Sequence, residues 1–163
     1  MLQKAISASI AVLLLVSVAH SKAALSRLFI SGGKLSKPIE ITDPGILQLS
    51  NPWFGSFISQ WNQVSEGTLT GPPSSTPRYE LSFYATFSPK EPPHIVYVAY
   101  YTFDPSTRSG FVYLPGHNEQ WYFTNSGSIL RPHQDGRWNL ANRDWSDKLN
   151  LIIASSEQRS SFD

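Results

Sequence analysis

Apolar and polar residues alternate with the period of a β-strand in the middle of the chain. From Tyr79 to Ser88 the odd-numbered positions are apolar or aromatic and the even-numbered ones are mostly polar, a pattern typical of a half-buried strand. The run from Ile95 to Phe103 is apolar on both faces and predicts a central, covered strand. Phe111 to Leu114 predicts a returning strand after the polar turn at 104–110. Three antiparallel strands are therefore expected here.

The beginning of the domain predicts a hairpin followed by short helices. Two β-like runs, Arg27–Ile30 and Pro38–Ile41, flank a turn that contains Gly32 and Gly33. Asp43 can cap a helix whose first residue is Pro44, so we expect a helix over about 44–49. After Asn51-Pro52, apolar residues recur at helical spacing between Trp53 and Trp61 and predict a second turn or helix.

The pattern weakens beyond Gly116. Gln120–Phe123 and Ser128–Leu130 are rich in aromatic and β-forming residues and predict two more short strands. Arg131–Asn139 lies between periodic segments and contains an Asp135-Gly136 turn signal, so we expect a loop there.

The end of the chain predicts one longer helix. Asn142 or Asp144 can cap it, and Trp145 begins a set of apolar residues at helical spacing that continues to about Ser155. The polar residues 155–163 are expected to form a frayed tail. Together the elements predict an α+β fold, an antiparallel sheet of about 5–7 strands with helices on one face; the alternative is an all-β sandwich or barrel.

Residues 1–23 have the pattern of an export signal. Lys4 precedes an apolar run within Ala5–Ala19, and Ser21-Lys22-Ala23 offers a small-x-small cleavage site. The run is shorter than the ~20 residues of a membrane span, although an uncleaved anchor is the alternative. We expect a single globular domain at 24–163, secreted or periplasmic, with no transmembrane segment after cleavage. The chain has no Cys, so packing alone must stabilise it.

Composition excludes one class of partner and favours one class of fold. Without Lys4 and Lys22, eleven basic residues remain against twelve acidic ones, and they are scattered singly. A nucleic-acid binder carries a clustered basic excess, so no nucleic-acid partner is expected. The chain has 12 Pro, 10 Gly and 21 aromatic residues, which indicates a turn-rich β domain with large core side chains.

Two His-x-carboxylate pairs provide the best candidate metal site. They are His117 with Glu119 and His133 with Asp135. If the two segments met, these side chains could bind zinc or another divalent metal and leave room for an activated water. The alternative is that all four are solvated loop residues, because such short motifs are common by chance.

A second set of residues predicts a binding surface. Aromatic and arginine side chains alternate in the turn-rich segments after the sheet: Trp121, Tyr122, Arg131, Arg137 and Trp138. Loop aromatics can stack on sugar rings or on a partner's side chains, and arginine supplies planar hydrogen bonds. The alternative is that Trp121 and Trp138 are buried against the C-terminal helix.

Four short motifs resemble a group of uncharacterised secreted bacterial proteins. They are Ile41–Pro44, Leu114–Trp121, Ile129–Arg131 and Asp135–Trp138. The resemblance covers most of the chain after residue 23. It implies export and a single domain, and it transfers no activity and no catalytic residue.

The function predicted first is a secreted or periplasmic non-enzymatic binding or interaction domain, with a glycan or protein partner and no cofactor. The chain has no Gly-x-Ser-x-Gly elbow and no thiol, so the balance is against an enzyme. One alternative is a small metal-assisted hydrolase that uses His117, Glu119, His133 and Asp135. Another is a structural subunit of an envelope complex. The binding hypothesis requires Trp121 or Trp138 to be exposed in a concavity.

Overall fold

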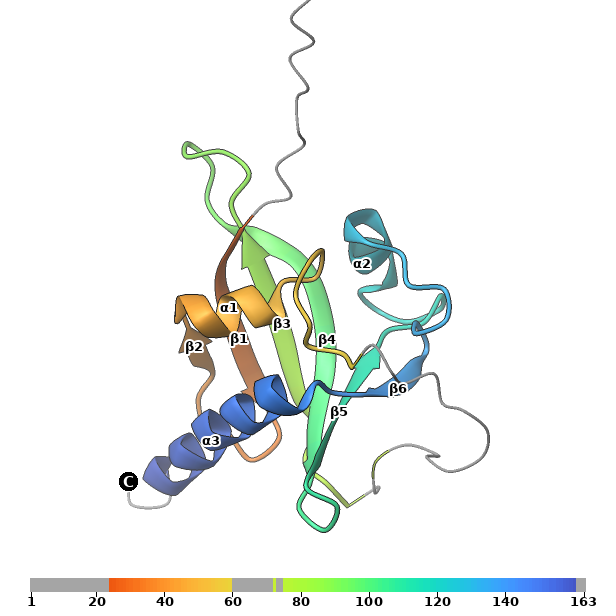
Figure 1. The fold of residues 1–163 in the computed structure, drawn as a ribbon. Helices are drawn as coiled ribbons and strands as arrows, with labels where there is room; N and C mark the ends of the chain where they lie inside the picture. Colours follow the sequence, from red (N-terminus) through yellow and green to blue (C-terminus); the bar gives the residue numbers. More distant parts are fainter. Residues whose placement is uncertain (1–23, 60–71, 73–74, 161–163) are drawn as a thin grey trace, which may run out of the picture.

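The computed structural model describes residues 24–59, 72 and 75–160. The predicted export signal, most of the loop around 67–77 and the predicted helical position of Trp61 lie outside these residues. The chain forms a single domain with an α+β fold, in which a six-stranded sheet has the order β2-β1-β3-β4-β5-β6 (Figure 1). Its elements are β1 (Leu25–Gly32), β2 (Ile39–Ile41), α1 (Pro44–Ser50), β3 (Tyr79–Ala85), β4 (His94–Asp104), β5 (Ser109–Leu114), α2 (Tyr122–Ser128), β6 (Arg137–Leu140) and α3 (Arg143–Ser160).

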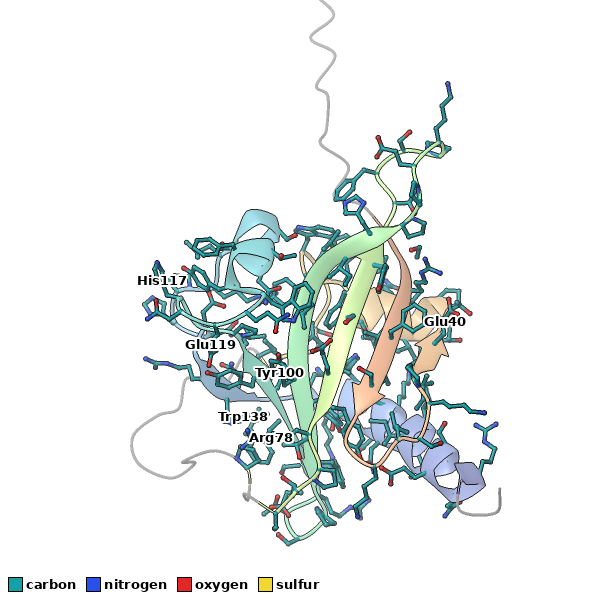
Figure 2. The ribbon with its side chains drawn as sticks, turned by 180° about the vertical axis from the view of Figure 1, so that it is seen from behind. Glu40, Arg78, Tyr100, His117, Glu119 and Trp138 are labelled. Atoms are coloured by element: carbon teal, nitrogen blue, oxygen red, sulfur yellow. The ribbon has the colours of Figure 1, made fainter. Side chains whose placement is uncertain are left out.

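Every neighbouring pair of strands is antiparallel, and the sheet is not closed into a barrel. The predicted α+β class is therefore confirmed. Helices α1 and α3 lie across one face of the sheet, and α2 lies beside β4 (Figure 1). The other face of β1, β3 and β4 is not covered by a helix (Figure 2). We call this second surface the open face.

The period-2 pattern decides which side chains face the helices. Leu28 and Ile30 of β1, and Leu81 and Phe83 of β3, lie at alternate positions along their strands and have no exposed surface. Phe57, from the segment after α1, packs on this layer, with its ring centroid 5.6 Å from that of Phe83. Burial of these apolar surfaces is the main favourable term that holds the sheet and helices together.

Two capping residues begin the helices where the sequence predicts. Asp43 accepts a hydrogen bond from the Ile46 amide at 2.9 Å and starts α1, with Pro44 as its first residue. Asn142 accepts from the Trp145 amide at 3.2 Å and starts α3, so the first of the two predicted caps is used. Helix α3 continues past the predicted end near Ser155 to Ser160.

The prediction of two strands at Gln120–Phe123 and Ser128–Leu130 is wrong, because these residues form α2 and its flanks. The reason lies in Asn125, which is buried on α2. Its Oδ1 accepts from the Val98 amide at 2.8 Å, and its Nδ2 donates to the Val98 carbonyl at 2.7 Å. The Asn125 side chain thus provides hydrogen-bond partners for the backbone of β4 beyond the point where β5 stops pairing with β4. This contact overrides the local strand propensity of the residues around Asn125.

Two further predictions need correction. The described part of the segment expected to be helical after Pro52 forms a turn, in which the Asn51 side chain accepts from the amides of Trp53 and Phe54. The segment then runs as irregular chain to Ile58, which forms a bridge with Ala141. The predicted loop at Arg131–Asn139 is also too long, because β6 pairs with β5 from Arg137 onward.

The buried tyrosines predict a loss of stability at alkaline pH. Burial raises the pKa of the hydroxyls of Tyr97 and Tyr101, both of which have no exposed surface. The unfolded chain loses these protons from about pH 10, before the folded chain does, so the free energy of unfolding falls above that pH. Each group contributes a slope of up to about 1.4 kcal/mol per pH unit. Urea unfolding between pH 8 and 11 should show a shallower decline for Tyr101→Phe; equal declines would contradict this account.

Candidate ligand-binding site

One row of side chains crosses five strands of the open face. Residues directly opposite each other in an antiparallel pair point to the same face. Following this register from strand to strand gives one row: Ser31 opposite Glu80, Glu80 opposite Tyr100, Tyr100 opposite Tyr113, and Tyr113 opposite Trp138. The sheet therefore gathers residues from distant parts of the sequence into one line.

This row forms the floor of a cavity of about 610 Å³. Arg78, at the start of β3, and Glu119, after β5, complete its lining with Gly32. We call it the open-face cavity. Figure 2 shows Arg78, Tyr100, Glu119 and Trp138 grouped on this face, whereas Glu40 lies toward the opposite edge of the sheet. The volume falls within the range typical of small-molecule sites.

The aromatic rings of the row contact one another. The ring centroids of Tyr113 and Trp138 are 5.3 Å apart, and those of Tyr100 and Tyr113 are 6.4 Å apart. The Arg78 guanidinium lies 5.3 Å from the centroid of the Trp138 ring, a cation–π contact. The cavity therefore offers a row of mutually tilted aromatic rings beside a positive charge.

Two carboxylates border this aromatic surface. Glu119 accepts hydrogen bonds from the Tyr113 hydroxyl at 2.8 Å and from the Gly116 amide at 2.6 Å. Glu80 accepts a longer one, at 3.3 Å, from the Ser82 hydroxyl. The Glu119 contacts fold the segment after β5 back onto the sheet and place its carboxylate at the cavity.

The tyrosines of the cavity remain neutral hydrogen-bonding groups at physiological pH. Burial, together with the hydrogen bond to Glu119 and its negative charge, raises the pKa of Tyr113 to about 12. Burial also raises the pKa of Tyr100, with smaller contributions from the charges of Glu80 and Glu119. Both hydroxyls are therefore protonated and can donate to a ligand or to a carboxylate.

Of the residues predicted to bind a ligand, Trp138 lines the open-face cavity, and the others lie elsewhere. Arg137 is exposed on β6 and does not line the cavity. Trp121 precedes α2 in the left-handed conformation, with φ of 75°, and its buried Nε1 has no hydrogen-bond partner among the described residues. Tyr122 packs on His117, with ring centroids 5.0 Å apart.

Arg131 and Asp135 make structural contacts with the chain around them. The Arg131 side chain donates to the Pro52 carbonyl at 2.6 Å and lies over the Phe57 ring, 5.6 Å from its centroid. The Asp135 carboxylate accepts from the Arg131 amide, and burial raises its pKa. These contacts attach the turn before β6 to the core, which places Trp138 at the cavity.

The predicted metal ligands are not brought together. His117 and His133 are exposed, and His117 is engaged with Asn118 and with the rings beside it. Glu119 belongs to the open-face cavity. Within residues 24–59 and 75–160 no group of three His, Asp or Glu side chains could hold a metal ion.

Sequence reasoning missed five of the side chains that line the cavity: Ser31, Arg78, Glu80, Tyr100 and Tyr113. Alternation along each strand shows which side of its own strand Ser31 or Tyr100 occupies. The pairing of the strands is needed to show that both lie on the same face of the sheet. Arg78 immediately precedes the predicted strand that begins at Tyr79. Its positive charge at that position was the sequence feature that could have identified it as a site residue.

Comparison with protein-family models, with curated proteins and with solved structures found no match. The resemblance to secreted bacterial proteins stays a prediction. Among the helices that the structure describes, none has the length and apolarity that crossing a membrane requires.

Proposed function

We propose that this chain is an exported, non-enzymatic binding domain that holds a saccharide in the open-face cavity. The observation that carries the proposal is the row of Tyr100, Tyr113 and Trp138 at the floor of a cavity of about 610 Å³. Apolar faces of sugar rings stack on aromatic side chains, and a row of three rings can support more than one sugar unit.

The polar lining supports the same kind of ligand. Glu80 and Glu119 accept hydrogen bonds, Arg78 donates them, and the tyrosine hydroxyls do both. A saccharide presents hydroxyl groups around the edge of an apolar ring face, so it can use an aromatic floor and a polar rim together. The few, placed polar groups are typical of a site that fixes a ligand's orientation.

Export is the second part of the proposal. The apolar run within 5–19 and the small-x-small sequence at 21–23 support a cleaved signal. Strand β1 begins at Leu25, so cleavage after Ala23 would remove no residue of the sheet. The metal-assisted hydrolase and the envelope subunit stay alternatives from the sequence, and no described contact favours either.

Trp138→Ala tests the proposed site. The variant is expected to weaken saccharide binding by about tenfold or more, because it removes the largest stacking surface of the cavity. Isothermal titration would use trisaccharides of glucosamine, N-acetylglucosamine and galacturonic acid. Trp121→Ala is the matched control, since Trp121 lies outside the cavity lining, and it should retain the wild-type affinity. Binding that depends on Trp121 and not on Trp138, or no binding of any of the three, would contradict the proposal.

A further inference from the structure

The charges of the open-face cavity are unequal. Among the described residues, its lining has one basic side chain, Arg78, and two acidic ones, Glu80 and Glu119, which give a formal charge of −1. The whole chain after residue 23 also has a formal charge of −1, so this cavity alone carries a charge as large as that of the entire domain. If the cavity holds a saccharide, as proposed above, this charge bears on which saccharide it holds.

Neither carboxylate is neutralised by a neighbouring cation. Among the described residues, no ion pair within 4.0 Å joins Glu80 or Glu119 to a Lys, Arg or His side chain. Their hydrogen-bond donors are neutral: a serine hydroxyl for Glu80, and a tyrosine hydroxyl and a backbone amide for Glu119. Both carboxylates can therefore accept hydrogen bonds from a cationic group of a ligand.

Both charges act on the same part of the cavity. Glu80 is directly opposite Tyr100 in the sheet, and the negative charge of each glutamate contributes to the raised pKa of the Tyr100 hydroxyl. The pair of Tyr100 and Tyr113 rings thus has a carboxylate beside each member: Glu80 opposite Tyr100, and Glu119 bonded to the Tyr113 hydroxyl. A cation is attracted by both features, because the face of an aromatic ring is negative.

Arg78 already shows that the aromatic floor accepts a cation. Its guanidinium lies over Trp138, and no ion pair with either glutamate holds it. Arg78 is exposed, so its side chain is free to turn toward solvent when a ligand enters. It is the one positive charge among the described lining residues and would repel a ligand cation.

We propose that the saccharide bound in the open-face cavity carries a protonated amino group, which Glu80 and Glu119 hold over the tyrosine pair. The ligand class is an amino sugar with a free ammonium group. The inference rests on the proposed function, but its test is separate: a neutral saccharide of the same size would satisfy the proposed function and not this inference.

The test compares two trisaccharides that differ in charge. At about pH 6 the trisaccharide of glucosamine is cationic, and that of N-acetylglucosamine is neutral. We expect the cationic one to bind about tenfold more tightly to the wild type, on the strength of paired carboxylates and cation–π contacts. Glu80→Gln and Glu119→Gln should each weaken its binding by about threefold more than they weaken binding of the neutral trisaccharide. Glu91→Gln, a similar change of charge in the exposed loop between β3 and β4, is the control.

Arg78→Gln provides a test of opposite sign. Removing this charge should tighten binding of the cationic trisaccharide by about threefold, because the repulsion is lost. Arg137→Gln, on β6 but outside the cavity lining, should change it by less than about twofold. Near-UV circular dichroism would establish that each variant keeps the wild-type fold.

Each result decides between specific outcomes. Equal affinities for the two trisaccharides, with Trp138→Ala weakening both, would overturn the inference and leave the proposed function standing. Preference for the trisaccharide of galacturonic acid, abolished by Arg78→Gln, would overturn the inference in favour of an acidic sugar. No binding of any of the three would overturn both proposals.

Discussion

Trp145→Ala is expected to lower the free energy of unfolding by about 3–5 kcal/mol, the largest effect of any single substitution considered for this chain. Trp145 has no exposed surface. Its ring centroid lies 5.5 Å from that of Tyr101 and 5.7 Å from that of Phe57. Its indole nitrogen donates to the Ser50 hydroxyl at 2.8 Å. The variant leaves a large cavity between α1, α3 and the sheet, and a buried hydroxyl without its donor.

Urea unfolding of the chain from residue 24 onward measures this loss, with Leu151→Ala as the matched control on the same helix. Leu151 is 67 % exposed, and its truncation should change the free energy of unfolding by less than about 0.5 kcal/mol. A Trp145→Ala variant as stable as Leu151→Ala would contradict the described packing of α3 on the sheet.

Asn125→Ala is expected to cost about 2–4 kcal/mol, because it leaves both the amide and the carbonyl of Val98 buried without partners. The effect should be largest at the edge of β4, where Asn125 takes the place of a neighbouring strand. Hydrogen exchange of the Val98 amide would accelerate in the variant, and urea unfolding would report the loss of stability.

Ser126→Ala is the control for this second prediction. Ser126 is adjacent on α2, and its hydroxyl bonds only within the helix, to the Phe123 carbonyl at 3.3 Å. It should change stability by less than about 0.5 kcal/mol. Unchanged exchange of the Val98 amide in Asn125→Ala would refute the role assigned to Asn125.

The contact between Asn125 and Val98 also has a consequence for the site. The segment 115–121, which carries Glu119, runs from the end of β5 to the start of α2. Asn125 holds one end of this segment through α2, and the Gly116 amide bonded to Glu119 holds the other. Loss of Asn125 should therefore loosen the carboxylate of Glu119 as well as the edge of the sheet.

The elements with strong local signals were predictable from the sequence. The alternation in Tyr79–Ser88 and the apolar run in Ile95–Phe103 correspond to β3 and β4, and Asp43-Pro44 begins α1 as expected. In each case the period or the cap is a property of adjacent residues, so no knowledge of the remaining chain was needed.

The elements that depend on a distant partner were not predictable in this way. Trp121, Tyr122 and Phe123 have the composition of a strand, yet α2 forms there, and the buried Asn125 makes its contact with a residue 27 positions earlier in the chain. The same limit applies to the site. Trp138 and Glu119 were both identified as candidates, but for different sites, because the register that brings them into one cavity is a property of the whole sheet.

The central claim, that the open-face cavity binds a saccharide, is tested most directly by two-dimensional ¹H–¹⁵N NMR during titration with the trisaccharide of glucosamine. The indole N–H signal of Trp138 reports on the cavity, and that of Trp121 reports on the surface near α2. We predict saturable shifts of the Trp138 indole and of the backbone amides of Tyr100 and Tyr113, with the Trp121 indole unchanged. Shifts confined to Trp121 and the residues around it, or no saturable shift at all, would contradict the account.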